Sequence, residues 1–318
     1  MSDLEAATVG ELLAVVEPFD VGSGLATSSL LRKSIGGAEV NVALTLARLG
    51  HSVGWVGAIG ADPFGAEGLR TLRGAGVDVS RVVVDATAPT GVYFKEVDAV
   101  GVLTNHAYRS GSAACRVRLR DLDVDYLCSG RVLHLTGITA LISDTGHEVI
   151  AQLVDLARQR RVHLSVDANV RRGLLGDRDA TDVLAPLLHG ADTLFLSTSE
   201  AALLMATDDP SRIQAELGRS TATTIVLHDH RGASAITADD IVRMPARTVA
   251  VVDPTGAGDA FAAGYLSGWL DNAPMVSRLR RAELCAAYAV ATRGDNPVDL
   301  PRALRDADPS DAGIEDVR

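Results

Sequence analysis

Short apolar runs alternate with longer amphipathic stretches along most of the chain. Fully apolar runs are typical of strands buried on both faces of a parallel sheet, and the stretches between them have the length and spacing of helices. The pattern therefore predicts an α/β fold, with a Rossmann-like, mainly parallel sheet flanked by helices. The predicted strands span 11–17, 52–60, 132–135, 162–167, 193–196, 224–227 and 249–253, and the predicted helices include 39–49, 144–160, 179–189 and 200–206.

Two segments, 19–34 and 89–118, interrupt this alternation, because neither contains a good helix. The second includes TGVYFKEV (90–97), in which apolar and polar residues alternate, as in a strand with one wet face. We expect the two segments to form a small separate β-sheet that serves as a lid over a cleft; a pair of long surface loops is the alternative. The α/β domain then comprises 1–18, 35–88 and 119–308, and the polar tail 309–318 is expected to fray.

Composition narrows the class of partner. The 318 residues carry a net charge of −11 and no basic run, which argues against nucleic acid as a ligand. The three cysteines lack metal-ligand or CxxC spacing and read as reduced thiols of a cytoplasmic protein. Neither a signal peptide nor an apolar run long enough to span a membrane is recognisable, so we expect no membrane partner.

The stretch DPTGAGDAFAAGYLSGWL (253–270) carries the clearest chemistry. It lacks GxxxxGK[ST], and Phe261 stands where a dinucleotide fingerprint has its third glycine. What remains is a strand, a glycine-rich turn and a helix that begins near Gly258. The N–H groups of Gly256, Ala257 and Gly258, together with the helix dipole, form an expected anion site.

Asp259 falls in the first turn of that helix, and two interpretations are open. An acid there complements the helix dipole, which is common. Alternatively, Asp259 is a base that accepts a hydroxyl proton while the N–H groups hold a transferring phosphoryl group. We expect the helix N-terminus to lower the pKa of Asp259, which a loose phosphoryl-transfer transition state tolerates.

DPTGAGDAFAAGYL and GGAEVNVALTLARLG (36–50) resemble, in order and spacing, the C-terminal and N-terminal signatures of the ribokinase-like (PfkB-type) carbohydrate kinases. The resemblance covers roughly 9–304. It implies a ribokinase-like α/β domain with a β-lid, ATP and Mg²⁺ as cofactors, and a sugar-like phosphoryl acceptor.

Within that family the chain is most similar to the 2-keto-3-deoxygluconate kinases. GGAEVNVA, TGVYFKE (90–96) and YRSGSAA (108–114) resemble segments that line the substrate in that subfamily. Its acceptor carries a carboxylate, which a planar guanidinium recognises bidentately. Arg109 and Arg171 are placed to do so, although DANVR (167–171) also resembles fructokinases, and a surface arginine is the simpler interpretation of Arg109.

The resemblance assigns the remaining site residues. At the acceptor it places Gly37, Asn41, Tyr93, Arg109, Ile138, Arg171 and Asp295, and at the nucleotide Ser197, His228, Gly232, Gly256 and Gly258. Glu200 resembles the acid that organises Mg²⁺ through water. Ordinary structural roles remain as alternatives: a helix cap for Asn41, a strand aromatic for Tyr93, a helix-terminal acid for Glu200 and a loop acid for Asp295.

Two departures leave the substrate open. Ala107 stands where the subfamily has a tyrosine that reaches the acceptor, and HDHRG (228–232) replaces the family's K-x-G-x-x-G turn at the nucleotide. A metal pair of His228 and His230 is a minor alternative. A kinase of a neutral sugar or a nucleoside is the second hypothesis, and a non-catalytic sugar-binding regulator the third. The exposed strands of the lid predict a homodimer formed through the lids.

Overall fold

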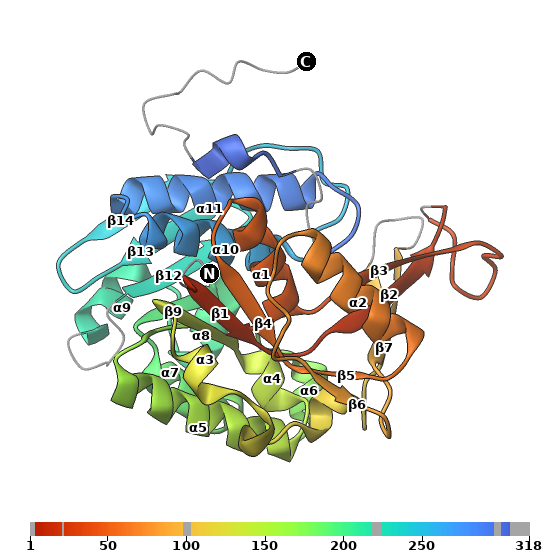
Figure 1. Ribbon diagram of the computed structural model, residues 1–318. Coiled ribbons are helices and arrows are strands. Elements are labelled where there is room, and N and C mark those ends of the chain that lie inside the picture. Colours follow the sequence, from red (N-terminus) through yellow and green to blue (C-terminus); the bar gives the residue numbers. More distant parts are fainter. Residues whose placement is uncertain (1–3, 21, 98–102, 218–223, 296–299, 306–318) are drawn as a thin grey trace.

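The computed structural model describes residues 4–20, 22–97, 103–217, 224–295 and 300–305. Its body is an eight-stranded sheet in the order β14-β13-β12-β11-β10-β9-β1-β4 (Figure 1). Neighbouring strands from β4 to β12 pair in parallel, and β13 and β14 add an antiparallel edge. Their bounds are β1 Ala6–Val9, β4 Val53–Val56, β9 Val132–Thr136, β10 His163–Asp167, β11 Thr193–Ser197, β12 Thr224–Asp229, β13 Gly232–Ile236 and β14 Ile241–Pro245.

Helices cover both faces of this sheet, which confirms the predicted α/β class (Figure 1). One face carries α1 (Ala38–Arg48), α10 (Ala257–Leu270) and α11 (Met275–Val290), and Leu44, Phe261 and Leu279 belong to the core beneath them. The other face carries α5 (Asp144–Arg160), α7 (Ala180–Gly190), α8 (Thr198–Leu204) and α9 (Pro210–Leu217) over a second core. None of the described helices has both the length and the apolar character that crossing a membrane requires.

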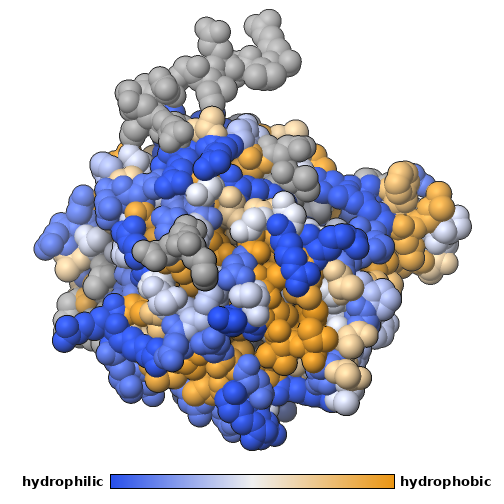
Figure 2. All heavy atoms as spheres, in the orientation of Figure 1, coloured by the Kyte–Doolittle hydropathy of each residue, from blue (hydrophilic) through white to orange (hydrophobic). Residues whose placement is uncertain are grey.

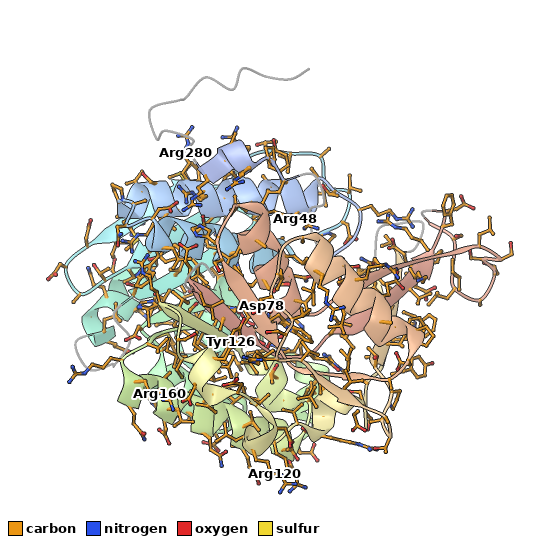
Figure 3. The ribbon with its side chains drawn as sticks, in the orientation of Figure 1. Arg48, Asp78, Arg120, Tyr126, Arg160 and Arg280 are labelled. Carbon is orange, nitrogen blue, oxygen red and sulfur yellow. The ribbon has the colours of Figure 1, made fainter. Side chains whose placement is uncertain are left out.

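Shorter elements complete the body. They are α2 (Pro63–Gly74), α3 (Val124–Leu127), α4 (Gly137–Leu141), α6 (Arg172–Leu175), three 3₁₀ turns (Ala113–Arg116, Leu119–Asp121 and Arg302–Arg305), and the two-stranded sheet of β5 (Ala58–Gly60) and β6 (Val83–Asp85). Tyr126 of α3 donates a 2.7 Å hydrogen bond to Asp78, the residue that pairs with β4 beside Gly54 (Figure 3). This contact joins α3 to the outer parallel strand.

A four-stranded sheet projects from the body, in the order β3-β2-β7-β8, and we call it the lid sheet (Figure 1). It consists of β2 (Leu13–Pro18), β3 (Leu31–Gly36), β7 (Gly91–Val97) and β8 (Leu103–Tyr108). The apolar segment 11–17 was predicted as a strand of the main sheet, and this assignment was wrong. β2 is buried along most of its length, lies between β3 and β7, and pairs in parallel with β7. Its apolar pattern therefore resembles that of a buried strand of the body.

Two other strand predictions need correction, and one strand was not predicted. The segment 52–60 divides into β4 and β5, which belong to two different sheets. The apolar stretch 249–253 is not a strand: Val251 and Val252 are exposed, and the N–H groups of Val252 and Asp253 donate to Val290 at the end of α11. The strand β1, which lies between β9 and the edge strand β4, was missed, because its sequence AATV is short and rich in alanine.

Candidate active site

A pocket of about 560 Å³ lies between the lid sheet and the carboxyl ends of the parallel strands. Side chains that follow β1, β9 and β10 line it from below, and β7 and β8 line it from the lid, as ligand sites in open α/β sheets commonly do. We call it the lid pocket. It brings together all the residues that were predicted at the acceptor: Gly37, Asn41, Tyr93, Arg109, Ile138, Arg171 and Asp295.

The DPTGAGD loop (253–259) forms one wall of the lid pocket through Thr255, Gly256 and Asp259. Gly256 caps α10 in a left-handed conformation, with φ at 78°. A Cβ atom on Gly256 would lie 1.8 Å from the carbonyl oxygen of Asp295, so only glycine fits. The first-turn N–H groups of a helix are suited to hold an anion, and at the start of α10 the Ala257 N–H lies 3.4 Å from the Pro254 carbonyl oxygen.

Asp259 is buried in the first turn of α10, with 9% of its surface exposed. Asn41 Nδ2 donates a 2.7 Å hydrogen bond to its Oδ2. Burial raises the pKa of Asp259 to about 6, and this outweighs the hydrogen bond from Asn41 and the charge of Arg171. The predicted lowering of the pKa was wrong, because the loss of water costs the carboxylate more than the helix dipole returns. A pKa near 6 suits a general base at neutral pH.

Asn41 lies inside α1, so the helix-capping alternative for this residue was wrong. The N-cap of α1 is Gly37, whose φ of 124° favours glycine. A Cβ atom on Gly37 would lie 2.1 Å from the carbonyl oxygen of Glu11. This close backbone contact brings the start of α1, and with it Asn41, against the lid pocket.

Arg109 lines the lid pocket but is engaged by a buried acid. Its Nε donates to Glu11 Oε2 at 2.9 Å, and its Nη2 forms a second, short contact with the same oxygen. Burial raises the pKa of Glu11, against the opposing influence of Arg109. Since a guanidinium has five N–H donors, this pairing fixes the orientation of Arg109 and leaves other donors for a ligand.

Ile138 and Arg171 enter the lid pocket from the ends of two adjacent strands, β9 and β10. Ile138 lies in α4, whose start is held by Glu39: the hydroxyls of Thr136 and Thr139 each donate to Glu39 Oε1 at 2.6 Å. Arg171 is exposed at the N-cap of α6 and contributes a positive charge that acts on Asp259. The pocket therefore has a cationic wall opposite the lid.

Tyr93 and Asp295 meet at the back of the lid pocket. The Tyr93 hydroxyl donates a short hydrogen bond to Asp295 Oδ2, while Lys95 Nζ lies 2.9 Å from Asp295 Oδ1. Burial raises the pKa of Asp295, with Lys95 acting in the opposite direction. Both residues thus belong to a connected polar network in which Tyr93 is more than an ordinary strand aromatic.

A second pocket, of about 410 Å³, lies at the turn between β12 and β13, and we call it the turn pocket. His228 and Gly232 line it, and Asp229 pairs with Gly232 across the turn. The half-buried His228 ring stacks on Phe261 of α10, with 5.1 Å between ring centroids, and His230 is exposed. The Cε1 atom of His228 would lie 3.7 Å from a Cβ atom on Gly258, so the first turn of α10 lies between the two pockets.

Ser197 and Glu200 form a capping box at the start of α8. Glu200 Oε2 accepts from Ser197 N–H at 2.8 Å, and Oε1 accepts from Val170 N–H at 2.6 Å. Within the described residues, neither side chain lines the lid pocket or the turn pocket. Nor do the described residues contain three clustered histidine, cysteine or acidic side chains able to hold a metal ion.

Sequence reasoning missed several residues of the site. Glu11, Asn105, Ser110 and Thr255 line the lid pocket, and Lys95 lies directly behind it. Lys95 had a usable signal: in the alternation of TGVYFKEV it shares a strand face with Tyr93. Glu11 had none, since a single acid before an apolar strand does not reveal its partner.

Comparison with known proteins identifies a family to which the sequence is similar. Residues 3–302 match the pfkB family carbohydrate kinase. The chain is 33% identical to a 2-dehydro-3-deoxygluconokinase of Thermoproteus tenax over 83% of this chain and 82% of the relative. Identity is 34% to that of Bacillus subtilis (92% and 91%) and 33% to a fructokinase of Klebsiella pneumoniae (81% and 86%).

Solved structures share the fold. A PfkB protein from Polaromonas sp. JS666 superposes with a TM-score of 0.85 at 30% identity, covering 96% of this chain and all of that one. A putative ribokinase II from E. coli, solved with ATP and Mg²⁺, gives a TM-score of 0.88 at 23% identity over 95% of this chain and 98% of its own. The predicted fold, with its small second sheet, is thereby confirmed.

Proposed function

The chain belongs to the pfkB family of carbohydrate kinases, and we propose that it transfers the terminal phosphoryl group of ATP to a hydroxyl of 2-keto-3-deoxygluconate or a similar acidic keto-sugar. One observation carries the proposal. The lid pocket holds the buried Asp259 together with the guanidinium groups of Arg109 and Arg171. A proton acceptor and cationic carboxylate partners therefore share one cavity.

Asp259 acts as the base in this proposal. The acceptor hydroxyl oxygen attacks the γ-phosphorus, its proton passes to the Asp259 carboxylate, and the bond from the phosphorus to the β-γ bridging oxygen breaks to release ADP. The N–H groups of Gly256, Ala257 and Gly258 stabilise the negative charge on the transferring group. The position of the first α10 turn between the two pockets supports this arrangement, with acceptor on one side and nucleotide on the other.

The turn pocket is the proposed nucleotide site. His228 and Gly232 line it, and Ser197 lies outside its lining, next to His228 on the neighbouring strand β11. Mg²⁺ usually takes one or two carboxylates and several waters in addition to phosphate oxygens. The residues fit such an ion, because Glu200 already accepts two backbone N–H groups and is suited to hold a water of its outer shell. When bound, Mg²⁺ neutralises charge on the phosphates.

A neutral ketose is the second candidate acceptor, and three observations favour it. Glu11 neutralises the charge of Arg109, which lowers the pocket's attraction for a carboxylate. Ala107 lines the lid pocket where a larger side chain would reach the ligand, and a fructokinase is among the similar proteins. The two candidate acceptors differ in whether Arg109 and Arg171 bind a carboxylate, so substitution of an arginine distinguishes them.

The experiment measures ADP release with Mg-ATP and four acceptors: 2-keto-3-deoxygluconate, fructose, ribose and adenosine. Turnover confined to the keto-deoxy acid supports the proposal, and Arg109→Met should then raise its KM by roughly 10- to 100-fold. Turnover with fructose, insensitive to Arg109→Met, would overturn the acidic acceptor. Sugar binding without any turnover would favour a non-catalytic regulator.

The lid sheet and its surface support two further parts of the proposal. We infer that the lid closes over the acceptor and excludes water, which limits wasteful hydrolysis of ATP. We also infer a homodimer through the lids, since β3 and β8 are edge strands and Phe19, Leu30 and Tyr108, in or next to the strands of the lid sheet, are exposed. Figure 2 shows apolar surface at the end of the lid that points away from the body. Only monomer in native mass spectrometry at micromolar concentration would overturn the dimer.

A cytoplasmic site of action is proposed from the chemistry that the enzyme needs. The ATP that this kinase would use is a cytoplasmic metabolite. Cys115, Cys128 and Cys285 are all free thiols, as expected in a reducing compartment. Activity that appears only after oxidation to a disulfide-linked form would contradict this location.

A further inference from the structure

Lys95 is a fully buried cation behind the lid pocket. It lies on β7 of the lid sheet, and only 1% of its side chain is exposed. Its Nζ lies 2.7 Å from Asp253 Oδ2, 2.9 Å from Asp295 Oδ1 and 3.8 Å from Glu17 Oε2. A buried ammonium costs several kcal/mol unless it is paired, so three surrounding carboxylates account for its presence.

These carboxylates come from three separate parts of the chain. Glu17 lies on β2 of the lid sheet. Asp253 is the first residue of the DPTGAGD loop, and Asp295 follows α11. A single ammonium therefore joins the lid to two segments of the body.

Both body segments act directly on the DPTGAGD loop. Asp253 Oδ1 accepts from Thr255 N–H at 3.0 Å, and its Oδ2 accepts from Gly294 N–H at 3.1 Å. On the other side, the backbone of Asp295 lies against Gly256 so closely that a Cβ atom there would not fit. Lys95 thus holds the loop from both flanks of Gly256.

We propose that Lys95 is a positioning residue that couples the seating of the lid strand β7 to the conformation of the DPTGAGD loop. The proposal rests on the proposed function in one respect, namely that this loop receives the transferring phosphoryl group. Lys95 itself lines neither the lid pocket nor the turn pocket. It acts through Asp253, Asp295 and Gly256. A change in the position of the lid strand β7 is then accompanied by a change in the conformation of the DPTGAGD loop.

The junction between lid and body at this point is ionic. A small cavity of about 30 Å³ is lined by Glu17, Lys95, Asp253 and Arg293, among other residues. Arg293 adds a second link, with its Nε 3.1 Å from Glu17 Oε1 and its Nη1 2.6 Å from the Phe19 carbonyl oxygen. Removing the Lys95 ammonium would leave carboxylates facing one another, and both the lid strand and the loop would lose their shared partner.

The test compares Lys95→Met with Lys33→Met by hydrogen–deuterium exchange. Lys33 is the matched control, because it also lies on the lid sheet and pairs with a glutamate, Glu67, but is exposed. We expect Lys95→Met to speed exchange by roughly tenfold or more in both 91–97 and 253–260, and Lys33→Met in neither. Faster exchange in the lid strand alone, or in neither segment, would overturn the coupling.

Kinetics give an independent readout. With whichever acceptor the wild type turns over, Lys95→Met should lower kcat by roughly 30- to 100-fold, because small misplacements of catalytic groups have effects of that size. The KM for that acceptor should change by less than about threefold, and Lys95→Arg should restore most of kcat. A change in KM alone would contradict a positioning role.

Failure of the proposed function and failure of the coupling can be told apart. A wild type that turns over none of the four acceptors refutes the proposed substrates, whereas the exchange experiment needs no acceptor and still decides the coupling. If Lys95→Met does not fold, Lys95→Gln, which removes the charge but keeps a polar side chain, serves in the same exchange experiment. Its neutral amide should speed exchange in both segments together, and a change in only one of them, or in neither, would overturn the proposal.

Discussion

The DPTGAGD loop begins and ends with a buried aspartate, and the two carboxyl groups lie in opposite electrostatic environments. At Asp253, burial is overcome by the hydrogen bond and charge of Lys95, which hold its pKa below the ordinary value. At Asp259, burial prevails and raises the pKa to about 6, since its hydrogen-bond donor Asn41 is neutral. Asp253, whose carboxylate is stabilised, and Asp259, whose carboxylate is destabilised, are thus only six positions apart in the sequence.

This difference separates the structural role that we propose for Asp253 from the catalytic role that we propose for Asp259. The Asp253 carboxylate is saturated by an ammonium and two backbone N–H groups, so it holds shape and has little tendency to take a proton. The Asp259 carboxylate lies buried at a pocket with too little positive charge nearby to offset the loss of water, so its pKa is raised. A raised pKa makes a carboxylate a more effective base near neutral pH. In this proposal the same residue type has two functions, and the neighbouring charges and hydrogen bonds determine which one.

The largest expected effect is that of Asp259→Asn on turnover. Removing the base should lower kcat by roughly 10³-fold, with KM for the acceptor nearly unchanged. Steady-state ADP release measures both constants. Asp144→Asn is the control, because Asp144 is also an acid in the first turn of a helix, α5, and complements only the dipole. Equal loss in both variants would mean that Asp259 merely complements its helix.

The two aspartates should also change stability with opposite signs. Burial raises the folded pKa of Asp259 from 3.8 to about 6, so its carboxylate opposes folding increasingly between these two pH values and fully above about pH 6. Asp259→Asn should therefore stabilise the protein by about 1–3 kcal/mol at pH 7.5. Asp253→Asn should destabilise it by about 1–3 kcal/mol, because Lys95 loses a buried partner.

Urea unfolding at pH 7.5 measures both free energies of unfolding. Opposite signs would sharpen the contrast between the two ends of the loop. Destabilisation by both substitutions would show that Asp259 is also a structural anion, and the comparison would fail.

The smallest effect is expected where an aspartate is paired at the surface. Arg231 donates to Asp229 Oδ2 through Nε at 2.9 Å, but 71% of the Arg231 side chain is exposed. Arg231→Ala should therefore change the free energy of unfolding by less than about 1 kcal/mol. The same urea titration measures it, and a loss as large as that of Asp253→Asn would mean that burial does not set the scale of these pairs.

Hydrophobic pattern was sufficient for the architecture but not for assigning every strand to its sheet. The apolar strands β9 to β12 were found because both of their faces are covered. The pattern failed at 249–253, an apolar segment that the fold leaves exposed, and at β2, whose parallel partner lies in the lid sheet. The periodicity of a strand indicates how much of it is buried, but it does not identify the strands or helices that cover it.

At the site, motifs located residues but not their electrostatics. The motif segments placed Asn41 and Asp259 at one pocket, although 218 positions separate them in the sequence. The sign of the pKa shift at Asp259 could not be read from the helix terminus, because it depends on burial by distant segments. Likewise, the engagement of Arg109 by Glu11 and of Lys95 by Asp253 arises only when the lid meets the body.

The pH dependence of kcat/KM for the acceptor, measured for the wild type from pH 5 to 8.5, tests the central claim most directly. The base must be ionised, and burial raises its pKa to about 6, so the rate should be constant above pH 7 and fall about tenfold per pH unit well below 6. Asp259→Asn should leave only a residual rate without that inflection. A wild-type rate that stays constant down to pH 5 would contradict the account, because an aspartate with an ordinary pKa, or a group other than Asp259, would then carry the proton.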